Sequence, residues 1–217
     1  MSTPGSGPRS APVAHISRSA LSANAGAARA RGIHFFSSLI LEADAWGHGA
    51  ELVRSVLAAE ALTPGGHGDG PTLEAAELFG VGHASATPAL RLTGTVLSVK
   101  DLRAGEGVSY GFAFRAPADT RVALVTGGYA QGIVRALGGA VDVAIAGERH
   151  PIVGRVAMDV CVVEVRDAVV RRGDEALFLG DPALGEPSLA DWVRATGLVP
   201  SELITMVGLR SIREEAP

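Results

Sequence analysis

The sequence has one lysine, one cysteine and no excess of basic charge. Of its 19 basic residues 18 are arginine, so any chemistry that needs a lysine amine is restricted to Lys100. The single cysteine, Cys161, excludes an intrachain disulfide and favours a reducing, cytoplasmic location.

Charge and hydropathy disfavour two classes of partner. The 217 residues carry 19 basic and 23 acidic side chains without a basic block, so a nucleic-acid partner has little electrostatic support. No uninterrupted apolar run reaches the length of about 18 residues that a membrane span needs. We also expect no metal site, because no Cys/His pair has ligand spacing and the histidines are scattered, as at His48, His67, His83 and His150.

The N-terminal third contains signals of one βα unit. Residues 1–12 are small, polar and rich in proline, and we predict a disordered leader. Residues 12–16 suit a short strand, and Ser19 suits the N-cap of a helix that ends at Gly32. The apolar run 33–41 predicts a parallel strand buried on both faces.

Beyond that strand, the spacing of apolar residues predicts a helix over 50–61. The breaker-rich stretch 64–71 predicts a flexible loop or a join between two segments. A short apolar piece, 73–81, then leads to a second loop at 82–88.

From Ala89 the pattern changes to short alternating segments separated by turns. Such spacing indicates an antiparallel barrel or sandwich. The predicted strands are 90–100, 107–114, 121–126, 141–146 and 152–165. Two short helices should follow, one after Ser188, where Ser188 and Asp191 are spaced as in a capping box, and one from Ser201.

Three phrases within residues 88–210 resemble the C-terminal domain of the alanine racemase family, in that family's order and spacing. They are Gly105-Glu-Gly-Val-Ser-Tyr-Gly111, Gly128-Tyr-Ala-Gln-Gly-Ile-Val-Arg135 and Pro151-Ile-Val-Gly-Arg-Val-Ala-Met-Asp159. The resemblance implies a C-terminal β domain over residues 89–217.

The resemblance also implies site residues that act on a partner subunit. Tyr110 matches a family base that moves the α-carbon proton and reaches across a dimer interface. Met158 and Asp159 match the pair that binds the substrate carboxylate, again in trans. From pattern alone, a tyrosine in a small β barrel is half-buried with its hydroxyl bonded nearby, and Asp159 is a strand-end carboxylate.

Two further residues of these phrases match family positions. Tyr129 matches a tyrosine at the active-site entrance, although Gln131 stands where the family usually has aspartate. Arg135 matches an arginine that sets the environment of the catalytic tyrosine. From pattern alone, Arg135 is a solvated charge.

The stretch Leu41-Glu-Ala-Asp-Ala-Trp-Gly-His-Gly49 resembles the family's cofactor phrase, V-K-A-D-A-Y-G-H-G. In the family that lysine forms the Schiff base with pyridoxal phosphate (PLP) and is the second base. Here Glu42 stands at the lysine position and Trp46 at that of the tyrosine. A carboxylate cannot form an imine, so we expect no covalently bound PLP. Lys100 lies in the first predicted strand of the β domain, where it cannot easily substitute.

The stretch before the β domain is short for the family's barrel. A (β/α)₈ barrel takes about 250 residues, and residues 13–88 have room for about two or three units. Phe79 and Gly80 resemble the L-Y-G phrase that holds the PLP phosphate near the last barrel strand, but residues 72–76 lack the arginine that precedes it in the family. The predicted fold class is therefore α+β: a remnant of a (β/α)₈ barrel, joined near 64–71, followed by an antiparallel β-barrel-like domain.

Three functions remain open from the sequence. The chain is a degenerate relative without racemase activity, or a β-domain module that docks on a full-length racemase and supplies Tyr110 in trans, or a functional alanine racemase. The family implies a homodimer, and the second function a heterodimer with a full-length racemase.

Overall fold

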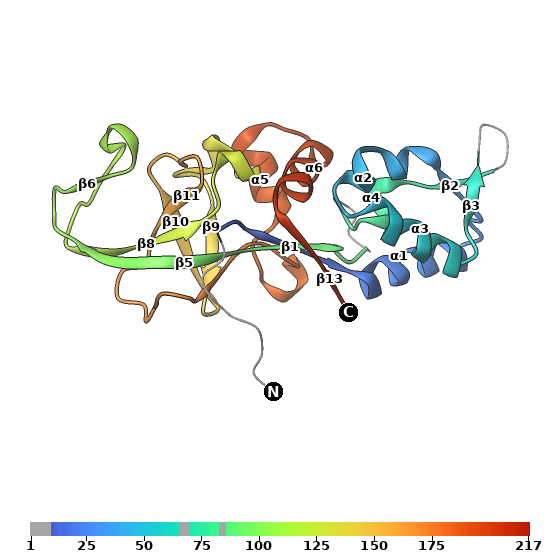
Figure 1. The fold of residues 1–217 in the computed structure, drawn as a ribbon, viewed down its shortest axis with the longest axis horizontal. Coiled ribbons are helices and arrows are strands. Elements are labelled where there is room, and N and C mark those ends of the chain that lie inside the picture. The colour runs from blue at the N-terminus through green and yellow to red at the C-terminus, as the bar shows by residue number, and fades with distance from the viewer. Residues whose placement is uncertain (1–9, 66–69, 83–85) are drawn as a thin grey trace. The chain divides into compact units, whose positions relative to one another are not determined.

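The computed structural model describes residues 10–65, 70–82 and 86–217, which form two compact units (Figure 1). One unit, the barrel unit, contains residues 92–197 and the described part of the segment before Ala14. The other, the parallel-sheet unit, combines residues 14–91 with 198–217. Most of the predicted leader lies outside the described residues, as do His67, His83 and parts of the predicted loops 64–71 and 82–88.

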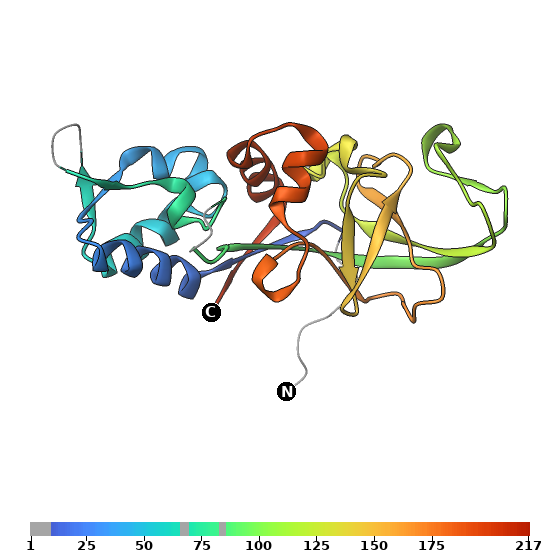
Figure 2. The same ribbon diagram turned by 180° about the vertical axis from the view of Figure 1, so that it is seen from behind.

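The barrel unit is built from a closed antiparallel sheet. The strand order is β12-β9-β10-β11-β8-β5, and β12 also pairs with β5, which closes the barrel. Figures 1 and 2 show β5 as the long green strand beside β8. The strands are β5 (Leu90–Leu102), β8 (Thr120–Thr126), β9 (Asp142–Ile145), β10 (Glu148–Val153), β11 (Val160–Glu164) and β12 (Glu175–Leu179). The predicted antiparallel barrel is confirmed.

Alternation of β-branched and small residues places one face of each strand in the barrel core. Ala123 and Val125 of β8 and Val163 of β11 are buried on this face. Phe178 is fully buried beside Gly94, where an added Cβ would lie 2.7 Å from the Phe178 ring. Glycine at this position therefore makes room for the largest side chain of β12.

The prediction of one continuous strand over 107–114 is wrong for the middle of that range. The segment is a small hairpin of β6 (Gly107–Val108) and β7 (Phe114–Arg115) around a 3₁₀ turn, η2 (Tyr110–Phe112). The backbone leaves the extended region because Ser109 has a φ of 71° and Phe112 a φ of 49°.

Two other boundaries in this unit differ from the prediction. The predicted strand 152–165 is two strands, because the chain turns at Gly154, with a φ of 68°, before β11 begins. Strand β12 was not predicted. Three 3₁₀ turns complete the loops: η3 (Tyr129–Gln131), η4 (Arg135–Leu137) and η5 (Pro182–Leu184).

The helix start predicted at Ser188 is confirmed, with Ser188 as the N-cap. Helix α5 (Leu189–Thr196) begins after Ser188, whose Oγ accepts a hydrogen bond from the Asp191 N–H at 3.2 Å. The other predicted helix, α6 (Pro200–Arg210), begins one residue before Ser201 and belongs to the parallel-sheet unit.

The parallel-sheet unit has a short three-stranded sheet in the order β3-β2-β4. Both pairings of the central strand are parallel, as predicted. Helix α1 packs against α3 and α4. The elements are β1 (Val13–Ser17), α1 (Arg18–Ala30), β2 (Phe35–Ser37), η1 (Ser38–Leu41), α2 (Glu42–Trp46), α3 (Ala50–Ala59), β3 (Thr63–Gly65), β4 (Thr72–Leu73), α4 (Ala75–Leu78), α6 and β13 (Ile212–Ala216).

Two predictions in this unit need correction. The buried strand predicted over 33–41 is extended only in β2, because its partners β3 and β4 are no longer than β2, and the chain then turns into η1. Helix α1 is capped by Ser17 rather than Ser19, since the Ser17 Oγ accepts from the Ala20 N–H at 3.1 Å.

No helix among the described residues is both long and apolar enough to span a membrane.

Candidate functional site

The hairpin that carries Tyr110 holds this side chain outside the barrel. Tyr110 is 67% exposed, and Met158 is 53% exposed. The Ser109 Oγ donates to the Arg155 carbonyl at 3.0 Å and accepts from the Arg155 N–H at 2.7 Å. This reciprocal pair of bonds ties the tyrosine turn to the loop that continues to Met158 and Asp159.

The second and third family phrases lie directly against each other. The Tyr129 N–H donates to the Ala157 carbonyl at 2.9 Å, and the Ala130 N–H to the Met158 carbonyl at 3.0 Å. A Cβ at Gly128 would lie 2.1 Å from the Met158 carbonyl oxygen. Only glycine permits this close backbone approach.

Side chains reinforce the same contact. The Gln131 Nε2 donates to the Asp159 Oδ1 at 2.9 Å, while its Oε1 accepts from the Gly128 N–H at 3.0 Å. The Arg135 guanidinium lies 4.4 Å from the centre of the Tyr129 ring. The structure therefore brings Tyr129, Arg135 and Asp159 together and links Tyr110 to them through one loop.

In the parallel-sheet unit, Glu42 is exposed at the start of a left-handed turn. Ala43, Asp44, Ala45 and Trp46 have φ values of 49°, 54°, 56° and 52°. Each such residue costs about 1–2 kcal/mol relative to a right-handed conformation. Local sequence does not favour this turn, so its surroundings must stabilise it.

Asp44 makes the side-chain bonds that hold the turn. Its Oδ1 accepts from the Ala50 N–H at 2.8 Å, and its Oδ2 accepts from Arg213 Nη1 at 2.6 Å. The bond from the Ala50 backbone and the Arg213 charge lower the pKa of Asp44 below its usual range. Gly47 lies against Gly208 of α6, where a Cβ on Gly47 would be 2.6 Å from the Gly208 backbone.

A buried ring stack lies beneath the turn. His48 stacks on Phe79 with ring centres 4.0 Å apart and an interplanar angle of 7°, and Trp46 packs on the same ring at 5.5 Å. Phe79 is fully buried, and a Cβ at Gly80 would lie 2.1 Å from the Thr87 carbonyl oxygen. Phe79 and Gly80 thus have packing roles, and their predicted cofactor role stays a prediction.

Two observations limit covalent chemistry. Lys100 is exposed on β5 of the barrel unit, so the parallel-sheet unit contains no lysine in its described residues. Cys161 is buried, and burial raises the pKa of its thiol to about 12, which disfavours a reactive thiolate. Among the described residues, no group of three or more His, Cys, Asp or Glu side chains is placed to hold a metal ion.

Comparison with known proteins places the barrel in a family. The family model "Alanine racemase, C-terminal domain" matches residues 89–215. The chain belongs to the alanine racemase family. The alanine racemase of Mycobacterium leprae is 43% identical over 134 residues, which are 61% of this chain and 34% of that protein. That of Thermobifida fusca is 39% identical over 123 residues, 57% of this chain and 33% of that protein. The matched region thus spans about a third of the length of these alanine racemases.

Solved alanine racemases share the fold. The structure from Streptomyces lavendulae aligns with a TM-score of 0.65 and 28% identity, over 92% of this chain and 61% of that one. The structure from Streptomyces coelicolor A3(2) aligns with a TM-score of 0.79 and 19% identity, over 95% of this chain and 98% of that one.

The residues present do not fit covalently bound PLP, the cofactor that the alanine racemase resemblance implies. An exposed carboxylate, Glu42, stands where the resemblance implies the lysine, and the only lysine of the sequence lies in the barrel unit.

Sequence reasoning missed Arg213 as a partner of the stretch 41–49. No local signal identifies it, because its contact with Asp44 joins residues 169 positions apart.

Proposed function

We propose that this chain is a non-racemising member of the alanine racemase family that does not hold PLP covalently. The observation that carries this proposal is Glu42, exposed at the position of the family lysine, with no lysine among the described residues of the same unit. A carboxylate cannot condense with an aldehyde, and its negative charge would repel the phosphate and phenolate of the cofactor.

The strand order supports the interpretation of residues 13–88 as a barrel remnant. In a closed parallel barrel the first strand lies between the second and the last. Strand β2 lies between β3, the next strand of the chain, and β4, which precedes the Phe79-Gly80 phrase. This arrangement is what remains if the middle of a barrel is removed and the ends are joined between β3 and β4. Residues 89–217 then correspond to the family's C-terminal domain.

The proposal is tested by incubating the full chain with PLP, recording absorbance, and reducing with borohydride before mass spectrometry. We expect no imine band and no pyridoxyl adduct on Lys100. The Glu42→Lys variant is the matched positive control, because it supplies an amine at the family position. An adduct on the wild-type chain, or conversion of L- to D-alanine that is lost in Tyr110→Phe, would support an active racemase instead.

A second candidate function is docking on a full-length alanine racemase. The exposure of Tyr110 and Met158 favours it, because a partner can contact both side chains. The Ser109–Arg155 bonds tie together the two segments that carry them. In this function the chain supplies Tyr110 to the partner's site, and a homodimer is the corresponding self-association.

Complementation tests the docking function. A full-length racemase whose matching tyrosine is replaced by phenylalanine should regain activity when this chain is added, and should not with the Tyr110→Phe chain. A monomeric chain that neither binds the racemase nor changes its rate would contradict this function.

A further inference from the structure

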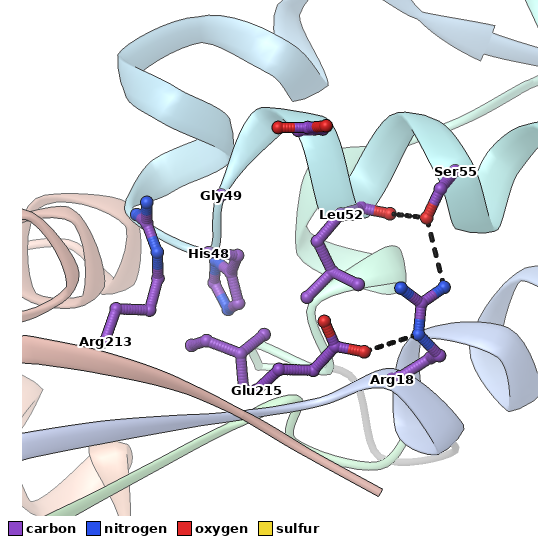
Figure 3. A pocket seen from close by; sticks show the side chains of 9 residues that line it. Arg18, His48, Gly49, Leu52, Ser55, Arg213 and Glu215 are labelled. Carbon is purple, nitrogen blue, oxygen red and sulfur yellow. Dashed lines mark hydrogen bonds and ion pairs between the residues drawn. The ribbon is translucent and has the colours of Figure 1, made fainter.

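A polar pocket of about 400 Å³ lies within the parallel-sheet unit (Figure 3). Its lining includes His48 and Gly49, the last two residues of the stretch 41–49, but none of the residues to which the family resemblance gives a role. Its volume falls in the range of about 300–1,000 Å³ that is usual for small-molecule sites. Its polar lining consists of Arg18, His48, Glu51, Ser55, Arg213 and Glu215.

The pocket contains a buried hydrogen-bond acceptor without a donor. His48 is fully buried, and its Nδ1 lies 2.9 Å from the Ala45 carbonyl oxygen. Because a carbonyl only accepts, Nδ1 carries the proton of the neutral ring, and Nε2 presents a lone pair. Nε2 has no hydrogen-bond partner. Figure 3 shows the ring between Arg213 and Leu52, directed toward the side on which Glu215 lies.

Charges of both signs line the same pocket. Arg18 donates from Nε to Glu215 at 2.6 Å and from Nη1 to the Ser55 Oγ at 3.0 Å. Arg213 uses Nη1 for both of its bonds, to Asp44 and to the Gly47 carbonyl. A guanidinium has five N–H donors, so both arginines keep donors that these bonds do not use.

The carboxylates balance the arginines. Glu51 has no ion-pair partner among the described residues, and Glu215 uses one oxygen for Arg18. With His48 neutral, two guanidinium groups face two carboxylates, and the lining has no net charge. Such a lining matches a ligand that carries one positive and one negative group rather than a simple anion or cation.

We propose that this pocket binds a small aliphatic amino acid. Its ammonium donates to the Glu215 carboxylate and, once the side chains that cover the ring give way, to His48 Nε2. Its carboxylate accepts from the unused donors of Arg213 and Arg18. Ile16 and Leu52 supply apolar surface for the side chain. The site goes beyond the proposed function, because it contains neither Glu42 nor Tyr110 and does not depend on whether racemisation is lost.

Three probes of related shape test the proposal on the full chain: L-valine, isobutylamine (the same amine without the carboxylate) and isovalerate (the same acid without the amine). Isothermal titration at pH 7 should show binding of valine and at least tenfold weaker binding of each analogue. Valine should also raise the Tm, because a ligand that binds only the folded state stabilises it. Equal affinity for either analogue, or no heat and no change in Tm at millimolar valine, would overturn the proposal.

Variants then locate the binding. His48→Phe keeps a ring on Phe79 but removes the acceptor, and Glu215→Gln removes one charge while an amide oxygen can still accept from Arg18. Each should weaken valine binding at least tenfold. The neighbouring Glu214→Gln is the matched control, because Glu214 pairs with His15 and does not line the pocket, and it should bind as the wild type does. If His48→Phe does not fold, Glu215→Gln decides alone, and unchanged binding in it refutes the proposed site.

Discussion

The Gln131 side chain joins two family phrases by donating to Asp159 at 2.9 Å while accepting from the Gly128 N–H at 3.0 Å. An amide suits both bonds, because it offers a donor to the carboxylate and an acceptor to the backbone. The aspartate usual in the family would instead place a second carboxylate beside Asp159. Glutamine at this position therefore removes one negative charge from the η3 turn, which packs against the loop that carries Met158.

The first prediction concerns this pair. Gln131→Glu should destabilise the barrel unit by about 0.5–1.5 kcal/mol at pH 7, because a hydrogen bond is lost and two exposed like charges meet. The loss should shrink as the salt concentration rises, because salt screens the repulsion between the two charges. Urea unfolding followed by Trp192 fluorescence in a Trp46→Phe background measures the loss. Adding Asp159→Asn should restore stability at pH 7, and a loss that does not change with salt concentration would contradict the explanation.

The second prediction concerns the left-handed turn. Asp44→Asn should destabilise the parallel-sheet unit by about 1–2 kcal/mol, because the bond to Arg213 loses its charge. The folded-state pKa of Asp44 is lowered, so the carboxylate contributes stability above pH 3.8 that is lost as the pH falls through its folded pKa. The variant should therefore lose less stability on acidification, measured by Trp46 fluorescence in a Trp192→Phe background. Glu42→Gln, at an exposed neighbour, is the control and should behave as its parent does.

The third prediction is a pH dependence that originates in one ring. Burial lowers the pKa of His48 to about 4 from 6.5. Between these values the unfolded chain binds the proton more readily, so stability is present above pH 6.5 and is lost as the pH falls toward 4. The slope is at most about 1.4 kcal/mol per pH unit. His48→Phe should remove this slope, whereas His15→Gln should keep it. A slope of the same size in His48→Phe would show that another group is responsible.

The fourth prediction compares the effects of two glycine substitutions on stability. A Cβ at Gly208 in α6 would lie 2.8 Å from the Gly47 Cα, so Gly208→Ala should destabilise the parallel-sheet unit by about 1–3 kcal/mol. A Cβ at Gly26 in α1 would meet only the Glu60 carboxylate at 3.5 Å. Gly26→Ala should therefore stabilise the unit by about 0.5–1 kcal/mol, because alanine favours a helix interior. Changes in Tm of the same sign would contradict the packing at Gly47.

The barrel was predictable because its signals are local. The alternation in the predicted strand 90–100, which lies in β5, and the serine before α5 each specify structure within a few residues. Strand β12 was missed because four of its five residues are buried in succession, so no alternation marks it. The predicted site residues of the barrel came from the family phrases, and the structure adds the contacts that join them.

The turn at 43–46 shows what local sequence cannot specify. Alanine and tryptophan do not favour positive φ, so propensity argues against the observed conformation. It depends on Arg213 and on the close approach of Gly208, both far along the chain. Rules based on periodicity and capping use only residues close together in the sequence, so they cannot predict such long-range contacts.

The division of the chain into units has a consequence for folding. The parallel-sheet unit combines residues 14–91 with residues 198–217, which the barrel residues 92–197 separate along the chain. Until these two segments meet, the turn at 43–46 lacks its contacts with Arg213 and Gly208. Bringing the segments together has a loop-closure cost that the continuous barrel segment does not have.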